Sequence, residues 1–138
     1  MNIHQLPLTP FRTPFFLANP HVQTILPKFI KLPKPNYQRH LHPDRTGTTQ
    51  VAYDFVFANT DNQPNLDKPL AVMFHGLEGS SDSHYAIAFA HQAHRLGYDA
   101  VIVHFRGCGG VDNTSELDYN AGDTAEAVHM FDLLKTQY

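Results

Sequence analysis

The fold is decided by residues 70–81, which read LAVMFHGLEGSS. An apolar run is followed by a His-Gly pair, and small and polar residues then open a helical pattern. A buried strand that passes through a glycine turn into a helix leaves backbone N–H groups unpaired at the turn. Such groups can stabilise the oxyanion that forms during acyl transfer. The stretch therefore predicts a strand, an oxyanion-type loop and a helix, in that order.

A second apolar run, at residues 99–105, follows the expected helix. That helix is expected over residues 83–96, with Gly97 as its stop, and its apolar residues recur at three- and four-residue spacing. They are Ala86, Phe89, Ala90, Ala93 and Leu96. A strand–helix–strand crossover joins parallel strands, and the runs at 70–74 and 99–105 are typical of strands buried on both faces. This pattern predicts the α/β class rather than a bundle or a sandwich.

Three further elements are expected around this unit. Residues 37–42 and 51–57 read as strands that pair as an antiparallel edge. A last helix begins near Asp123, where Asp123 and Glu126 have capping-box spacing, and it directs apolar residues toward the core. These residues are Val128, Phe131 and Leu134. The predicted architecture is a mixed, mostly parallel sheet flanked by helices.

The N-terminal segment differs from the rest of the chain. Eight of the ten prolines lie in the first 43 residues, among many apolar side chains, and only residues 21–29 could form a short helix. We expect an apolar, Pro-rich arm over residues 1–35 that packs on a domain of residues 36–138.

Composition narrows the possible functions. The 138 residues carry a net charge of −3 and a single cysteine, Cys108. No broad basic field for nucleic acid is present, so no nucleic-acid partner is expected. One cysteine fits a reducing compartment, and neither a membrane-length apolar run nor a signal peptide is found, so the cytoplasm is the expected location. No motif calls for a cofactor.

Four motifs resemble one protein family. They are NPHVQTIL at residues 19–26, HGLEGSSDSHY at 75–85, HFRGCGG at 104–110 and YNAGDT at 119–124. Together and in this order they resemble the YheT-like branch of the α/β-hydrolases. The resemblance implies a partial α/β-hydrolase fold, here its N-terminal portion, with the esterase-like chemistry of a serine hydrolase acting on carboxylic esters.

The nucleophile of that family is not found in these residues. The serines are Ser80, Ser81, Ser83 and Ser115, and none lies in a G-x-S-x-G elbow. Cys108 has Arg106, not glycine, two positions before it. We therefore expect the chain to be truncated before the elbow, to have no catalytic residues and to be inactive alone. A triad built from unrelated positions stays open, because triads are defined by geometry.

The loop after the first apolar run supplies the main site candidate. The backbone N–H of Leu77 is expected to be an oxyanion donor, while His75, Gly76, Glu78 and Gly79 support the loop. His75 is interpreted as orienting the loop rather than as a base, because in this fold the base follows the serine. Glu78 and Asp82 are expected to cap the following helix.

The glycine-rich loop after the second run has two interpretations. Arg106 and Gly107 could begin a phosphate or nucleotide site, but no complete phosphate-binding motif occurs. The favoured interpretation is a glycine turn that Arg106 pins to nearby carbonyls or carboxylates.

The histidines at 40, 42, 84, 91 and 94 could suggest zinc. Surface histidines are favoured over a metal site, since no Cys pair or H-E-x-x-H motif supports one.

Three hypotheses about function remain open. The first is an N-terminal hydrolase fragment that carries the oxyanion loop but no triad. The second is half of a split hydrolase, completed by a C-terminal chain, with self-association through an exposed sheet edge as the related risk. The third is a non-catalytic binding module that uses the arm. An ester or lipid-like substrate is expected only if the hydrolase is completed.

Overall fold

The computed structural model describes residues 10, 12–59, 61, 63–120 and 122–138. They belong to two compact units, Met1–Lys31 and Leu32–Tyr138. Residues 32–35, which the sequence assigned to the arm, thus lie in the second unit. There His91 Nε2 donates to the Pro33 carbonyl across 2.7 Å, and Lys34 pairs with Asp82. Whether the arm packs on the domain stays a prediction.

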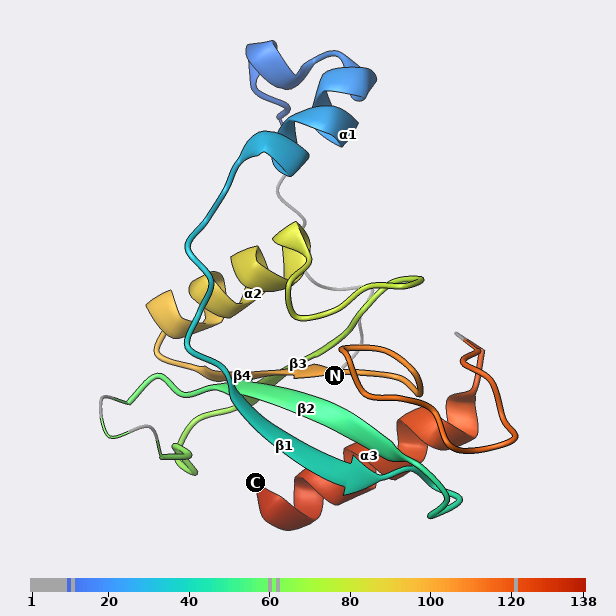
Figure 1. The fold of residues 1–138 in the computed structure, drawn as a ribbon. Coiled ribbons are helices and arrows are strands. Elements are labelled where there is room, and N and C mark those ends of the chain that lie inside the picture. Colours follow the sequence, from blue (N-terminus) through green and yellow to red (C-terminus); the bar gives the residue numbers. More distant parts are fainter. Residues whose placement is uncertain (1–9, 11, 60, 62, 121) are drawn as a thin grey trace. The chain divides into compact units, whose positions relative to one another are not determined.

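The first unit holds the 3₁₀ helix η2 (Phe15–Leu17) and the helix α1 (Pro20–Phe29) (Figure 1). The Asn19 side chain caps α1 by accepting a hydrogen bond from the His21 N–H at 2.8 Å. Pro20 occupies the first turn, where a missing N–H costs no helical hydrogen bond. The short helix expected over residues 21–29 is therefore present, one residue longer than predicted.

The second unit is built on one four-stranded sheet. Its strands are β1 (Gln38–Pro43), β2 (Gln50–Val56), β3 (Leu70–Phe74) and β4 (Asp99–Val103), in the order β1-β2-β4-β3. The β1–β2 and β2–β4 pairs are antiparallel, and β3 pairs with β4 in parallel, with Val72 opposite Val101. The mixed sheet, the antiparallel strand pair and the parallel crossover unit agree with the sequence prediction. The expectation that the sheet is mostly parallel was wrong for the described strands, because only the β3–β4 pair is parallel.

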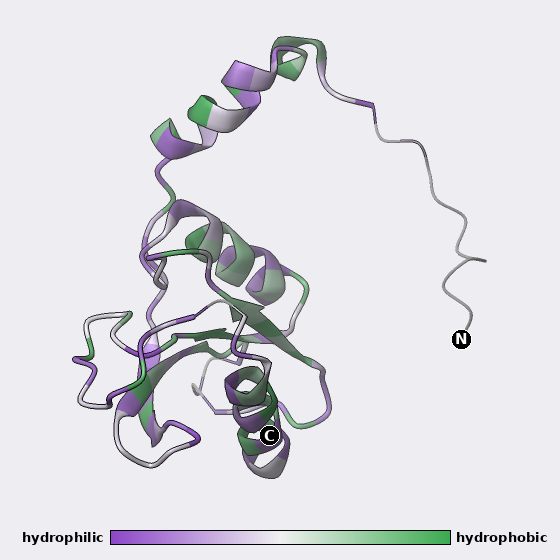
Figure 2. Ribbon diagram, turned by 90° about the vertical axis from the view of Figure 1, so that its right-hand side faces the viewer, coloured by the Kyte–Doolittle hydropathy of each residue, from purple (hydrophilic) through white to green (hydrophobic). Residues whose placement is uncertain are grey.

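Two helices cover opposite faces of this sheet, α2 (His84–Arg95) and α3 (Thr124–Gln137) (Figure 1). Figure 2 shows hydrophobic and hydrophilic sides on both helices, and hydrophobic colour along the strands between them. On the α3 side, aromatic and branched side chains of β2 and β4 pack against Met130 and Leu134. On the α2 side, Ala86 and Ala90 pack against Val56 and Ile102. The small residues of α2 allow a close approach to the sheet.

The two parallel strands differ in burial. Every residue of β4 is buried, whereas every residue of β3 is only half-buried. Within the described residues β3 lies at the sheet edge, with β4 as its strand neighbour on one side. The prediction of burial on both faces was therefore right for β4 and wrong for β3.

The apolar stripes of the helices were partly misplaced. Val128 and Phe131 of α3 are 58% and 43% exposed, and Leu96 lies beyond the end of α2 and is exposed too. The buried positions of α3 are Glu126, Met130 and Leu134. An acidic residue occupies a core position because an arginine pairs with it there, and periodicity of apolar residues could not indicate this.

The predicted helix caps were correct at one helix only. The Asp123 side chain accepts from the Glu126 N–H at 3.0 Å and caps α3, but the Glu126 carboxylate turns inward instead of completing the capping box. At α2 the capping residue is Ser83, without a side-chain cap, while Asp82 pairs with Lys34. The prediction that Glu78 and Asp82 cap this helix was wrong, because Lys34 holds one carboxylate and the other lies in the preceding turn.

Across the residues placed in the structure, no helix is both long enough and apolar enough to cross a membrane.

Candidate functional site

The loop of residues 75–83 follows β3 and leads into α2. A tight turn forms where the Gly79 N–H donates to the Gly76 carbonyl at 2.9 Å, and Tyr85 at the start of α2 accepts from the Gly76 N–H at 3.1 Å. Gly79 is required here, since a Cβ at this position would collide with the Tyr85 hydroxyl. Glu78 has a positive φ of 52°. The turn is therefore closely defined despite its exposed tip.

Leu77 lies at the tip of this turn. Its side chain is 82% exposed, and its backbone N–H has no hydrogen-bond partner among the residues that the structure describes. An unpaired N–H at the carboxyl end of a parallel strand is the arrangement that an oxyanion donor needs. The structure thus places the sequence-predicted donor on an anchored loop, open to solvent.

His75 directly follows β3 and is buried. Its Nδ1 lies 2.7 Å from the Gly76 carbonyl oxygen, and its Nε2 accepts from the Phe105 N–H at 3.2 Å. A carbonyl can only accept and a backbone N–H can only donate, so the ring is neutral with its proton on Nδ1. Burial lowers the pKa of His75, in agreement with this state. Both nitrogens bond to backbone groups, so the Nε2 lone pair of His75 is occupied by the Phe105 N–H and is not free for base catalysis.

His104 follows β4, and its two ring nitrogens are bonded in the same way as those of His75. Nδ1 lies 3.0 Å from the Ala52 carbonyl oxygen, and Nε2 accepts from the Ser81 N–H at 3.0 Å. Burial lowers the pKa of this ring too, more than the neighbouring Asp54 charge raises it. His104 thereby joins β2 to the loop that carries Leu77.

The fold brings together a serine, a histidine and an aspartate that the sequence analysis did not connect. Ser81 Oγ donates to Asp54 Oδ2 at 2.5 Å, and His104 Nε2 lies 3.8 Å from the same oxygen. These groups do not form a catalytic triad, because the serine hydroxyl faces the carboxylate and the imidazole accepts from a backbone amide. All three residues are buried. The one available signal was Asp54, a charge within the apolar run of residues 51–57.

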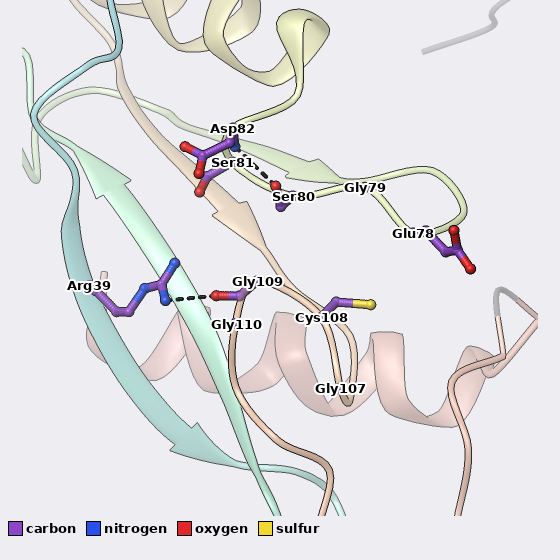
Figure 3. A pocket seen from close by; sticks show the side chains of 10 residues that line it. All are labelled: Arg39, Glu78, Gly79, Ser80, Ser81, Asp82, Gly107, Cys108, Gly109 and Gly110. Carbon is purple, nitrogen blue, oxygen red and sulfur yellow. Dashed lines mark hydrogen bonds between the residues drawn. The ribbon is translucent and has the colours of Figure 1, made fainter.

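A cleft of about 540 Å³ lies between the loop of residues 78–82 and the loop of residues 107–110, with Arg39 of β1 at its side (Figure 3). Glu78 and Asp82 give it acidic character. Cys108 lies in this cleft, but burial, with a contribution from Glu78, raises the pKa of its thiol. A thiolate nucleophile is therefore disfavoured there.

Arg106 points away from this cleft and into the protein. Its guanidinium bonds to Asp44 at 2.6 Å, to Asp123 at 3.2 Å, and to Glu126. Burial alone would raise the pKa of Asp44, but hydrogen bonds from Arg106, Thr46 and the backbone lower it to about 2. The cation is fully used, so it is not available to a phosphate beside Gly107. Pinning to carboxylates is what the structure shows.

The five histidines considered for a metal site either make other contacts or lie on the surface. The His40 and His42 rings are 6.3 Å apart and pack on Phe55 and Tyr53 of the neighbouring strand. Among the described residues no three His, Cys, Asp or Glu side chains are grouped as metal ligands.

The chain is similar to known proteins over most of its length. No family model matches the chain. It is 37% identical over 115 residues to "Putative esterase YheT" of Escherichia coli (strain K12), and 30% identical over 116 residues to an abhydrolase domain-containing protein of Dictyostelium discoideum. Each match covers 80% of this chain, but only 32% and 28% of the relative, so the chain spans about a third of the length of these relatives.

A solved structure supports the fold. An α/β serine hydrolase homologue from Coxiella burnetii matches with a TM-score of 0.54 and 14% identity, over 78% of this chain and 49% of that one. At this identity the similarity concerns the fold alone. Taken with the sequence relationships, it identifies the chain as a relative of the YheT-like α/β-hydrolases that carries part of their domain.

Proposed function

We propose that this chain supplies the oxyanion loop and one wall of the substrate cleft of an ester hydrolase, with the Leu77 N–H as the first oxyanion donor. The observation that carries the proposal is the unpaired, exposed N–H of Leu77 on a turn fixed by Gly79 and Tyr85. It follows a parallel strand, where α/β folds place their ligands. An acyl ester or lipid-like ester is the substrate class that this chemistry suits.

We further propose that the nucleophile comes from outside these 138 residues, so that the chain is inactive by itself. Ser81 is buried against Asp54, the pKa of the Cys108 thiol is raised, and no G-x-S-x-G occurs in the sequence. In this fold the second oxyanion donor is the N–H that follows the nucleophile. A single donor contributes little without its partner and the attacking group.

We propose that the missing part of the hydrolase domain joins this chain at the edge of β3. Half-buried Phe74 and exposed Phe131 and Val128 lie on the strand and on α3, and the Phe74 and Phe131 rings are 5.2 Å apart. A strand added to this edge would bind the free backbone groups and cover the apolar side chains. We propose that it belongs to the remainder of a hydrolase domain, and that without it two copies associate through this edge. A reducing compartment such as the cytoplasm suits the single thiol.

The experiment compares the chain alone with the chain co-expressed with a polypeptide carrying the rest of a YheT-like domain. Alone, it should not hydrolyse short p-nitrophenyl esters above buffer. The complex should hydrolyse them and lose activity on treatment with a serine-reactive phosphonate. Phosphonate-sensitive turnover by the chain alone would contradict the proposal, as would a complete lack of association.

Leu77 allows a matched test within that complex. Leu77→Pro removes the N–H, and we expect kcat to fall by about 10²–10³. Leu77→Ala keeps the N–H and removes most of the side chain, so it should retain activity within about threefold. Equal effects of the two changes would show that the side chain, and not the N–H, is important.

A second candidate, a binding module, is favoured by the charge of the N-terminal segment. Residues 1–43 contain five Lys or Arg and no Asp or Glu, whereas residues 44–138 contain five Lys or Arg and thirteen Asp or Glu. Large apolar side chains of this segment, such as Phe15 and Phe29, are not buried within their unit. An acidic protein would be its partner. Removing residues 1–31 should abolish capture of that partner and leave the second unit folded; an unfolded product would show instead that the arm covers the core.

A further inference from the structure

A buried carboxylate on β2 has no part in the function proposed above. Asp54 lies in the middle of the strand and is buried, with apolar neighbours Tyr53 and Phe55 on either side in sequence. A buried charge is costly unless it is paired and hydrogen-bonded. Arg39 of β1 meets this need with a bidentate contact, Nε to Oδ1 and Nη2 to Oδ2, each at 2.7 Å.

The same pair reaches both walls of the cleft. On one side Asp54 accepts the Ser81 hydroxyl at 2.5 Å. On the other, Arg39 Nη1 donates to the Gly109 carbonyl at 2.7 Å, the contact drawn in Figure 3. Residues 78–82 and 107–110 are separate loops, and the Asp54–Arg39 pair bonds to both of them.

Ser81 is held at three points. Its N–H donates to His104 Nε2, its O–H donates to Asp54, and its carbonyl accepts from the Tyr37 hydroxyl at 3.0 Å. Both acceptors are fixed on the sheet, since His104 is also bonded to the Ala52 carbonyl. Ser81 therefore fixes the position of the loop at a point four residues after Leu77.

We propose that Asp54 is a positioning residue that acts through Ser81 and Arg39. It fixes the distance between the two loops of the cleft and the direction of the Leu77 N–H. The second part rests on the proposed function, because only an ester hydrolase needs that N–H as a donor. The first part concerns the chain itself.

The negative charge is the property that matters. Arg39 donates to both carboxylate oxygens, so an asparagine at this position would turn its NH₂ group toward an Arg39 donor in either orientation, and at least one of the present contacts would be lost. Burial works to raise the pKa of Asp54, but the hydrogen bonds from Arg39 and Ser81 outweigh it and lower the pKa. The carboxylate thus stays charged at neutral pH.

The test is amide hydrogen exchange by NMR on the 138-residue chain. Ser81→Ala removes one hydroxyl and leaves the Asp54–Arg39 pair intact. We expect exchange at position 81 and at Gly79 to rise about tenfold or more, and the Leu77 amide resonance to shift. Exchange at Val101 and Ile102 of β4 should stay within about twofold. Asp54→Asn should produce the same pattern and also release Gly109 and Gly110.

Asp82→Asn is the matched control, because it removes an adjacent, exposed carboxylate that pairs with Lys34. It should leave the exchange of the loop unchanged. The proposal is overturned if Ser81→Ala leaves loop exchange unchanged, or if it raises exchange in β4 equally, which is global destabilisation.

The complemented hydrolase separates this inference from the proposed function. There Ser81→Ala should lower kcat with KM changed less than about twofold, because only transition-state binding is lost. An active complex whose kcat does not change would overturn the link to Leu77. If no complex is active, the proposed function fails, while the exchange experiment still decides whether Asp54 positions the loops.

Discussion

The two loops at the carboxyl ends of the parallel strands begin alike and end differently. Each starts with a buried histidine whose ring nitrogens both bond to backbone groups, His75 after β3 and His104 after β4. Each then turns through glycine. The loop after β3 leaves Leu77 exposed at its tip, whereas the loop after β4 sends Arg106 into the interior to bind three carboxylates.

This difference indicates that the two loops have different roles. The Arg106 loop joins the sheet to α3 and to the turn after β1, so its interactions stabilise the fold. The Leu77 loop is held at its base by contacts of His75, Tyr85 and Ser81, and it presents backbone groups to solvent. Substitutions in the first loop should therefore affect stability, and those in the second should affect the site.

Arg106→Ala should have the largest effect. It leaves Asp44, Asp123 and Glu126 without their shared cation, and removing one partner of a buried ion pair costs about 3–5 kcal/mol. Urea unfolding measures the loss, and a chain that no longer folds agrees with it. Arg45→Ala is the control, because Arg45 is exposed and its contacts of 3.8 and 3.9 Å are worth less than about 1 kcal/mol. Similar losses in the two variants would contradict the anchoring role.

Two neighbouring glycines give the next effect. Both Gly109 and Gly110 have positive φ, 66° and 78°, but a Cβ at Gly109 would collide with the His104 ring, while one at Gly110 meets open space. Gly109→Ala should therefore cost about 2–4 kcal/mol, from strain and overpacking together. Gly110→Ala should cost about 1–2 kcal/mol, from strain alone. Equal losses of stability in the two variants would show that the contact between the His104 ring and Gly109 does not require a glycine at position 109.

The sequence predicted the elements better than the interior of the site. Strands and helices follow from local apolar patterns, and the glycine turn after β3 fixed where the Leu77 N–H would lie. What it did not predict were polar groups that are buried in pairs. Asp54 meets Ser81 and Arg39 from distant segments, and Glu126 occupies a core position because Arg106 reaches it. Periodicity treats a charged residue as exposed, so such partners become visible only in the folded chain.

The half-burial of β3 has another cause. An apolar run reports how well a segment tolerates burial, but the number of neighbours it acquires depends on which strands are present beside it. The run at residues 70–74 is as apolar as that at 99–103. Of these two strands, β4 has a strand on each side in the described sheet and β3 does not. The sequence could not distinguish the two.

The two histidines predict a loss of stability at mildly acidic pH. The pKa of His75 and of His104 is lowered in the fold, so the unfolded chain takes up protons below about pH 6.5 that the folded chain does not. Stability should therefore fall as pH falls from about 6.5, by up to about 1.4 kcal/mol per pH unit for each histidine, until each folded pKa is reached. Urea midpoints between about pH 7.5 and about pH 5.5 measure it. A His104→Gln variant, less stable throughout, should show a shallower slope; an unchanged slope would mean that His104 takes up its proton at the same pH in the folded and the unfolded chain.

Glu78 should give the smallest effect and the sharpest contrast between the loops. The loop after β4 has glycine at each positive φ, whereas the turn after β3 places a glutamate at φ 52°. Glu78→Gly relieves this strain but adds freedom to the unfolded chain, so we expect a gain of about 1 kcal/mol or less. Glu78→Gln keeps the strain and removes only the charge, so stability should not change. Burial is the main cause of the raised pKa of Cys108, and the charge of Glu78 raises it further. Both variants remove this charge, so both should speed alkylation of the thiol by iodoacetamide. A destabilised Glu78→Gly variant would mean that the glutamate holds the turn through its side chain, and the strain would then be a requirement of the oxyanion loop rather than a cost to it.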